Sequence, residues 1–346
     1  MIYEEVTIEN FRGIRICHVE HLGQINIFFG KNNCGKSSLL EALFLLTGQS
    51  NPMLPLQVNN IRGINVSSED DVTSIFYRSQ KENIIEIKSK GEATRHLKIS
   101  LSEEPDISTV QSDKKKKIDS TPISRFAINL KYETGAAADK HYSKIILAGG
   151  KATKVVRDPG YKEKIIGSYI ASGSMINDER RDLEDIIKNK EESHILDGLK
   201  LLEPRIQGIQ LVGRKIMADV GLPTLLPINV LGDGTRRVLP LLLSIFKMRG
   251  GLLFMDEIEN GLHYSVMEGL WTTMMHAAIK FGTQIFISTH STDIIKSLIN
   301  AHAAMDGGAP TVSAYKLIRK DDDELMALRY DAAQLSYVSN QEIEVR

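Results

Sequence analysis

The segment GKNNCGKS at residues 30–37 constrains this chain most, because it lies between an apolar run and a helical pattern. The run QINIFF before it is β-branched and aromatic, as a buried strand would be, and it stops at Gly30. The helical pattern begins near Lys36 and ends at Gly48, where a glycine commonly ends a helix. This order fits the phosphate-binding pattern G-x-x-x-x-G-K-[ST] in the context it requires. The alternative, a glycine turn with a chance lysine, does not explain the preceding strand.

Each residue type in this loop has a physical reason. Gly30 and Gly35 let the backbone curl so that successive amide groups face phosphates, aided by the helix N-terminus. Lys36 would meet the β- and γ-phosphates, and the Ser37 hydroxyl would coordinate Mg²⁺. The expected ligands are therefore ATP and Mg²⁺. The residues predicted to contact the nucleotide here are Gly30, Asn32, Asn33, Cys34, Gly35, Lys36, Ser37 and Ser38.

Two later strands end in side chains that suit the same chemistry. In GGLLFMDE, Asp256 and Glu257 close an apolar run; Asp256 would hold Mg²⁺, directly or through water, and Glu257 would polarise the attacking water. Buried acids are costly unless a cation or ordered water compensates them, and a surface turn would not explain the apolar run. His290 follows the strand TQIFIST, where a histidine can sense the γ-phosphate. The catalytic residues predicted are Glu257 and His290, and the metal ligands are Ser37 and Asp256.

The segment LGDGTRR at residues 231–237 is a glycine turn that begins a helix, and so a second anion site. The phosphate loop already occupies the phosphates of its own nucleotide. A second anion site therefore suggests phosphates bound in trans, with two copies of the chain enclosing two nucleotides.

Together with IENFRGI near the N-terminus, FMDEIENGLH and ISTHS, these motifs resemble the ABC-type ATPases of the recombination-repair and structural-maintenance-of-chromosomes group. The closest likeness is to the overcoming-lysogenization (OLD) family. The resemblance covers about the first 50 and the last 130 residues. It implies that His290 is the switch histidine, that Asn260–His263 touch the opposite monomer, and that Arg12 contacts the nucleotide. The implied signature loop is Gly232, Asp233 and Gly234.

Two departures from the family pattern matter. Gly232 stands where a transporter-like LSGGQ has serine, so a hydroxyl contact to the γ-phosphate is lost. Arg236 or Arg237 would substitute with charge, although a solvated helix face explains at least one of them equally well. The glutamine that usually links the metal to the middle lobe is not assigned. Its candidates are Gln57, Gln207 and Gln210.

The expected fold is α/β: an ABC-type P-loop ATPase head with a split core, an inserted antiparallel β lobe and a helical lobe. The core is expected at residues 1–50 and 226–346, and the insertion at 51–225. In the insertion, TSIFYRS, NIIEIKS, HLKISLS, FAINLKY and KIILAGG alternate as antiparallel strands would. The polar run with Lys114–Lys117 predicts a solvated loop rather than a phosphate contact. Residues 178–220 are helical in pattern, with Pro204 separating two helices.

Composition limits the kinds of partner that the chain can bind and the cellular compartment in which it is expected. The net charge of −1 argues against a protein that coats nucleic acid, although a local basic patch is compatible with it. Two cysteines do not make a disulfide framework. The chain begins with acid where a signal peptide carries lysine or arginine, and no long apolar span follows. A cytoplasmic location without a membrane partner is expected.

The sequence has no recognisable nuclease motif, and this leads to the hypothesis that a separate protein supplies the nuclease. OLD-type proteins commonly carry a TOPRIM nuclease domain after the ATPase, but here YKLIRKDDDELMALRYD predicts only a hairpin whose acids, Asp321–Asp323, form a solvated tip. The leading hypothesis is the ATPase subunit of an anti-phage defence system, a homodimer or larger homo-oligomer that controls a separate effector nuclease. The alternative is a recombination-mediator-like repair ATPase acting on DNA. A scaffold with vestigial nucleotide binding conflicts with the intact Lys36 and Glu257.

Overall fold

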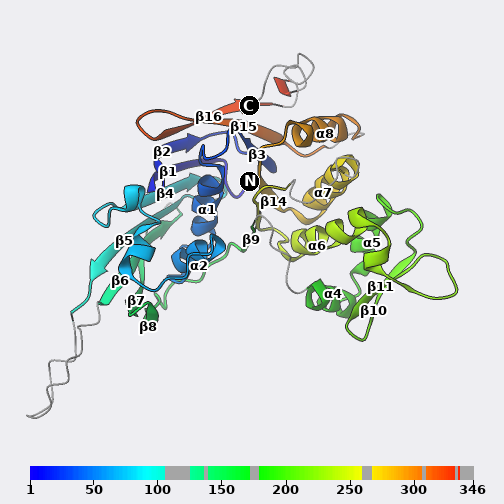
Figure 1. The fold of residues 1–346 in the computed structure, drawn as a ribbon, viewed down its shortest axis with the longest axis horizontal. Coiled ribbons are helices and arrows are strands. Elements are labelled where there is room, and N and C mark those ends of the chain that lie inside the picture. Colours follow the sequence, from blue (N-terminus) through cyan, green and yellow to red (C-terminus); the bar gives the residue numbers. More distant parts are fainter. Residues whose placement is uncertain are drawn as a thin grey trace, which may run out of the picture.

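The computed structural model describes residues 1–105, 125–135, 139–171, 179–258, 267–305, 309–331 and 334–335. Its centre is a 13-stranded sheet in the order β8-β7-β6-β5-β4-β1-β2-β16-β15-β3-β14-β13-β9, beside which lie helices and a smaller sheet, β10-β11-β12 (Figure 1). The strands are β1 (Glu5–Phe11), β2 (Ile14–Val19), β3 (Ile25–Phe29), β4 (Ile85–Lys90), β5 (Arg95–Glu103), β6 (Arg125–Thr134), β7 (Asp139–Ala148), β8 (Lys151–Val156), β9 (Gly167–Ile170), β10 (Gly208–Val212), β11 (Lys215–Asp219), β12 (Leu226–Pro227), β13 (Leu252–Met255), β14 (Gln284–Thr289), β15 (Val312–Arg319) and β16 (Glu324–Tyr330). The helices are α1 (Lys36–Thr47), α2 (Leu54–Ile61), α3 (Glu69–Thr73), α4 (Glu179–Lys188), α5 (Glu192–Lys200), α6 (Asp233–Lys247), α7 (Met267–Phe281) and α8 (Thr292–Ala303), with 3₁₀ turns η1 (Tyr77–Ser79) and η3 (Ile228–Val230).

The parallel part of the large sheet carries the predicted motifs. Strands β15, β3, β14, β13 and β9 pair in parallel, and every residue of β3, β13 and β14 is buried. Strands covered on both faces read as continuous apolar runs, which is why the sequence identified these three. Alternate residues serve opposite faces: Phe254 packs in the cluster that contains α1, whereas Leu253 and Met255 pack with α6, α7 and α8.

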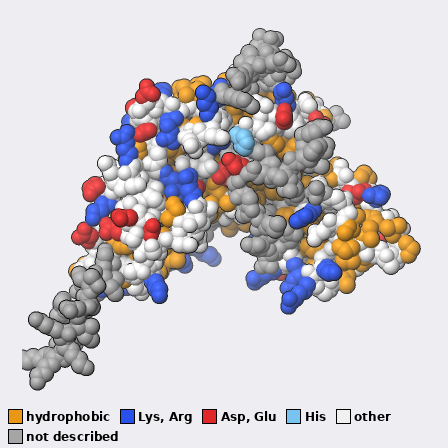
Figure 2. All heavy atoms as spheres, viewed as in Figure 1, with side chains coloured by type: hydrophobic (Ala, Val, Ile, Leu, Met, Phe, Trp, Pro, Cys, Tyr) orange, Lys and Arg blue, Asp and Glu red, His pale blue; other side chains and the backbone are white. Residues whose placement is uncertain are grey.

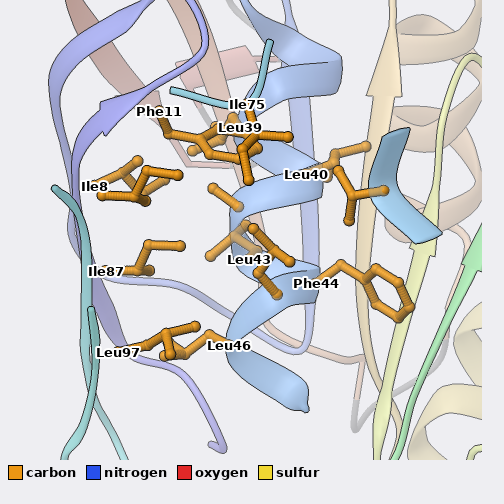
Figure 3. Packing of buried hydrophobic residues seen from close by; sticks show 14 of the residues in the cluster. Ile8, Phe11, Leu39, Leu40, Leu43, Phe44, Leu46, Ile75, Ile87 and Leu97 are labelled. Atoms are coloured by element: carbon orange, nitrogen blue, oxygen red, sulfur yellow. The ribbon is translucent and has the colours of Figure 1, made fainter. Parts of the chain in front are cut away.

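Helix α1 lies between the two halves of the large sheet. It contacts β1, β4 and β5 on one side and β9, β13 and β14 on the other. Figure 3 shows Leu43 and Leu46 pointing toward Ile87 and Leu97 of the antiparallel strands, while Phe44 points to the opposite side. The helix is therefore buried on almost all sides, which explains its continuous apolar sequence.

The antiparallel strands of the predicted insertion extend the N-terminal hairpin. Strand β4 pairs with β1, and β5 to β8 follow in a meander, so one sheet crosses the boundary expected at residue 51. Strand β9, from the same insertion, completes the far edge beside β13. NIIEIKS, HLKISLS, FAINLKY and KIILAGG are strands, as predicted. The run with Lys114–Lys117 lies outside the described residues.

The prediction of a strand at TSIFYRS is wrong. The segment begins at Thr73, the last residue of the short helix α3, and contains the 3₁₀ turn η1. The physical reason is a capping box, in which the Ser68 side chain accepts a hydrogen bond from the Asp71 amide while the Asp71 carboxylate reaches back. This capping signal favours a helix at the start of the segment, and the short alternation of apolar and polar residues in TSIFYRS does not form a strand.

The prediction of helix throughout residues 178–220 is correct only for its first half. The break between α4 and α5 lies at residues 189–191, where Lys190 has φ 57°, and Pro204 follows α5 rather than separating two helices. Beyond it, β10 and β11 form an antiparallel hairpin whose turn contains Gly213 with φ 60°. A turn glycine with positive φ favours a hairpin over a continuing helix.

The C-terminal elements agree with the sequence. Helix α6 begins at the predicted glycine turn, and β15 and β16 form the predicted hairpin. Both cysteines are free and buried. None of the helices in the described ranges is long and apolar enough to cross a membrane.

Candidate nucleotide site

The loop after β3 has the backbone that a phosphate loop needs. Gly30 has φ 145° and Gly35 has φ 115°, values that side-chain-bearing residues rarely adopt. A Cβ on Gly30 would also lie 2.7 Å from the carbonyl oxygen of Leu317 on β15. Glycine is therefore required there for two reasons. Asn32 and Asn33 are exposed at the loop tip, and burial raises the pKa of the Cys34 thiol beneath it.

Helix α1 begins with its first amide groups available. Its N-cap is Gly35, no side chain caps it, and its first turn contains no acid, so the partial positive charge of the helix end is uncompensated. Lys36 is only 7% exposed, and its Nζ donates to the carbonyl oxygens of Gly30 at 2.9 Å and Lys31 at 3.0 Å. The ammonium group thus lies over the curled loop, where phosphate oxygens would be its natural partners.

Three strand ends bring the metal-binding side chains together. Ser37 Oγ donates to Asp256 Oδ1 at 3.0 Å, across 219 residues of sequence. Ser288, on β14, donates to the same oxygen and accepts the amide hydrogen of Glu257 at 2.9 Å. A hydroxyl and a carboxylate are the oxygen ligands that Mg²⁺ prefers, so Ser37 and Asp256 fit the ion they are predicted to hold.

Glu257 and His290 face each other at the edge of this site. Glu257 has φ 52°, and the two side chains approach to 3.9 Å between Glu257 Oε1 and His290 Nδ1. Both are partly exposed, at 34% and 44%. A partly exposed carboxylate in an unusual backbone conformation suits the activation of a water molecule beside a bound phosphate. The predicted grouping of Asp256, Glu257 and His290 with the phosphate loop is therefore present, and their roles stay predictions.

The glycine turn at residues 231–237 also has its expected local form. Gly232 is the N-cap of α6 with φ 108°, it is exposed, and no atom lies within 4 Å of a Cβ built on it. Gly234 follows in the first turn of the helix. The side chains of Asp233 and Arg237 and the segment Asn260–His263 lie outside the described residues. The prediction that these groups contact a nucleotide in trans stays open.

Arg12 is buried against helix α1. It is 8% exposed, and its Nε donates to Glu41 of α1 at 2.6 Å. Its other donors reach Ser74, Val58 and Asn59. Because these acceptors all belong to the protein, the guanidinium connects the β1–β2 turn to α1 and α2. The predicted contact of Arg12 with the nucleotide stays a prediction.

Arg62 was missed by the sequence reasoning, although it lies beside the loop. Its Nη2 donates to Ser38 Oγ at 3.0 Å and its Nε to Glu41 at 2.6 Å, while 37% of the side chain remains exposed. It is thus an accessible cation next to a hydroxyl predicted to contact the nucleotide. No pattern in the sequence marks it, because it follows α2 in a region without a recognised motif.

The three glutamines considered for the metal-linking position are elsewhere. Gln207 and Gln210 belong to the hairpin region of the small sheet, on the far side of α6 from α1 in Figure 1, and Gln57 is exposed on α2. The side chain that does approach Asp256 from a neighbouring strand is Tyr169 of β9, whose pKa is raised by burial and then by the charge of Asp256. Its short strand has no distinctive sequence signal.

The acidic hairpin tip at residues 321–323 is bound rather than freely solvated. Arg15 pairs with Asp322, and Tyr77 and Arg78 both donate to Asp323, whose side chain is 23% exposed. The expected solvated tip is wrong for Asp323, since Tyr77 and Arg78 of η1 and Arg319 of β15 surround its carboxylate. Within the described ranges, no three His, Cys, Asp or Glu side chains are grouped as a metal site.

The fold and the site together define a P-loop ATPase head. A family model described as "AAA domain, putative AbiEii toxin, Type IV TA system" matches residues 25–296, and the chain belongs to this family. The matched range begins at β3 and ends within α8, so it contains the phosphate loop, the acidic pair and His290.

The chain is also similar to individual proteins. An "ATP/GTP phosphatase" of Helicobacter pylori is 24% identical over 377 residues, which cover 96% of this chain and 97% of the relative. An uncharacterised protein of Methanocaldococcus jannaschii is 40% identical over 89 residues, covering 25% of this chain and 40% of that one. Among solved structures, an Smc head bound to the C-terminal winged-helix domain of ScpA has a TM-score of 0.50 at 10% identity, covering 96% and 98% of the two chains. This last likeness concerns the fold alone.

Proposed function

We propose that two copies of this chain associate head to head around two Mg²⁺–ATP molecules, and that hydrolysis releases them. The observation that carries this proposal is the position of α6. Helix α1 and the phosphate loop cover one face of the parallel strands, whereas α6, with Gly232 at its exposed N-terminus, belongs to the layer on the other face. A turn on the opposite face cannot close over the chain's own nucleotide. A second copy can present it.

The dimer can be tested in a variant that binds ATP without turning it over. We expect Glu257→Gln to form a dimer in size-exclusion chromatography with Mg²⁺–ATP and a monomer without it. Adding Arg236→Glu, in the exposed first turn of α6, should prevent the dimer but leave ATP binding by the monomer intact. Lys247→Glu, at the other end of the same helix, is the matched control. If Arg236→Glu dimerises as well as Lys247→Glu, the N-terminus of α6 is not in the interface.

The biological role we propose is that of an ATPase subunit in a cytoplasmic anti-phage defence system, controlling a separate nuclease. Its support is the likeness of the motifs to the OLD family, the toxin–antitoxin description of the matched family, and the acidic tip whose carboxylates are held by Arg15 and Arg78. Native co-purification should yield a nuclease whose association depends on nucleotide. Plasmid cleavage by the isolated chain that persists in Asp256→Ala would contradict this division of labour.

A second candidate, an ATPase acting on DNA, is favoured by the edge formed by β8 and residues 157–166. This segment carries five exposed cations and two acids. The acids turn inward: Asp158 is 2.9 Å from His141, and Glu163 is 2.8 Å from Arg95. The outward side is therefore basic although the whole chain is nearly neutral. Figure 2 shows Lys and Arg side chains along the lower rim, on both sides of the hollow beneath the molecule. The five cations are Lys151, Lys154, Arg157, Lys162 and Lys164.

This candidate predicts salt-dependent binding of duplex DNA. We expect Lys162→Gln/Lys164→Gln to reduce the slope of log affinity against log salt by about 0.9 for each phosphate that the protein no longer neutralises. Lys280→Gln/Lys320→Gln makes the same change in net charge elsewhere and should leave the slope unchanged. Equal effects of the two pairs, measured by fluorescence anisotropy, would show that the edge does not bind DNA.

A further inference from the structure

A buried hydroxyl beside the nucleotide site has no hydrogen-bond partner. Tyr169 lies on β9, and its ring packs between Phe44 of α1, at 5.6 Å between centroids, and Phe254 of β13, at 6.4 Å. Its Oη is buried and unbonded in the part of the chain that the structure describes. Nearly all buried hydroxyls in native proteins are bonded. An unbonded one next to a ligand site indicates a bond that forms when the site is filled.

The strand register places this hydroxyl on the Asp256 side. Tyr169 is paired with Phe254, and Asp256 is two residues further along, so all three face the α1 side of the sheet. The Asp256 amide also donates to the Ile170 carbonyl at 2.9 Å, which continues the ladder to this point. A tyrosine hydroxyl can donate one hydrogen bond, and Asp256 provides a carboxylate on this face of the sheet.

The carboxylate of Asp256 has capacity for another donor. Its Oδ1 accepts the hydroxyls of both Ser37 and Ser288. An ionised carboxylate offers two oxygens with about four acceptor positions, so Oδ2 can accept as well. When Ser37 turns a lone pair toward a metal ion, the hydrogen bonds on Asp256 decide how the carboxylate is oriented.

We propose that Tyr169 is a positioning residue of the metal site, whose hydroxyl donates to Asp256 Oδ2 when Mg²⁺–ATP is bound. The bond fixes the carboxylate in the orientation that receives the ion. Tyr169 does not touch the nucleotide, so it acts through Asp256. The proposal rests on the Mg²⁺–ATP site of the proposed function, and it gives β9 a direct connection to that site.

The competing role for Tyr169 is packing alone, and Tyr169→Phe separates the two. The substitution keeps the ring against Phe44 and Phe254 and removes an oxygen that has no bond in the nucleotide-free protein. The melting temperature without nucleotide should therefore stay unchanged or rise. Tyr132→Phe is the matched control. The Tyr132 hydroxyl, on β6, is hydrogen-bonded at 3.2 Å to Ser143 of the neighbouring strand β7, within the antiparallel part of the sheet. This substitution should lower the melting temperature slightly.

The deciding measurement is the Mg²⁺ requirement for ATP binding, determined by calorimetry in the Glu257→Gln background. We expect Tyr169→Phe to raise the Mg²⁺ concentration for half-saturation roughly 10-fold or more. ATP affinity in EDTA should not change, and Tyr132→Phe should match the parent protein in both conditions. A structural defect would instead weaken ATP binding with and without the metal.

An unchanged Mg²⁺ requirement in Tyr169→Phe overturns this inference and leaves the proposed function standing, provided that the parent protein binds ATP in a Mg²⁺-dependent manner. An equal loss of ATP binding in EDTA and in Mg²⁺ overturns it as well, since the residue would then act through the fold. If the parent protein shows no Mg²⁺ dependence at all, the metal site of the proposed function fails first, and the inference fails with it.

Discussion

Glu41 provides the sharpest test of how the nucleotide site is supported. It is 1% exposed on α1, and its two carboxylate oxygens accept from Arg12 and Arg62, each at 2.6 Å. In Glu41→Gln the shape is retained but the charge is lost, which leaves the buried Arg12 without a counter-ion. Breaking a buried ion pair from one side costs about 3–5 kcal/mol, and we expect the lower end, about 3 kcal/mol, because the amide oxygen still accepts.

The loss of stability expected for Glu41→Gln can be compared with that for a substitution of Arg62, the other cation bound to Glu41. Its side chain is 37% exposed, so solvent screens its half of the pairing, and Arg62→Met should cost at most about 1 kcal/mol. Urea unfolding of the nucleotide-free variants, followed by circular dichroism and tryptophan fluorescence, measures both changes if the two probes coincide. A loss in Glu41→Gln no larger than that in Arg62→Met would refute the reasoning that burial of Arg12 makes Glu41 essential.

Three further outcomes are expected. Lys36→Ala should abolish ATP binding in calorimetry, since the loop loses the cation held over it; tight binding would exclude the phosphate-loop assignment. Glu257→Gln should bind ATP but hydrolyse it at least about 100-fold more slowly in a phosphate-release assay, and wild-type turnover would mean that another group activates water. For Glu86, burial alone would raise the pKa, but hydrogen bonds from Lys88 and His96 outweigh it and lower the pKa to about 2. Its stabilisation should be complete above about pH 4.3 and disappear as the pH falls to about 2, so the melting temperatures of wild type and Glu86→Gln should converge in that range.

The parts of the fold that sequence could predict are those with a local physical signal. Strands β3, β13 and β14 are buried on both faces and read as apolar runs. Gly30 marks the start of the phosphate loop, and Gly48 marks the end of α1. The site residues at these strand ends could be placed for the same reason, because parallel strands end at one edge of the sheet.

The parts that sequence could not predict depend on pairing across long distances. Strand β9 has four partly buried residues and gains its position from β13, which lies some 85 residues later in the chain. Tyr169 reaches the site through this strand pairing and Arg62 through its contact with Glu41, so neither has a sequence signature. Arg12 shows the reverse case: the motif indicated a nucleotide contact, which stays a prediction, and gave no sign of its buried pairing with Glu41.

The arrangement of α1 suggests how nucleotide state reaches the rest of the molecule. The N-terminus of this helix faces the phosphate site, while its sides contact β4 and β5 in one direction and β9 and β13 in the other. Strand β13 is the physical link to the opposite layer, because Phe254 packs toward α1 while Leu253 and Met255 pack toward α6 and α7. Asp256 ends that strand and is bonded to Ser37 at the start of α1. When the ligand redirects Ser37 toward a metal ion, the hydrogen bond between Ser37 and Asp256, which connects the two layers, changes. Interior packing is too dense to absorb such a shift locally, so α6 and its exposed N-terminus should move relative to α1.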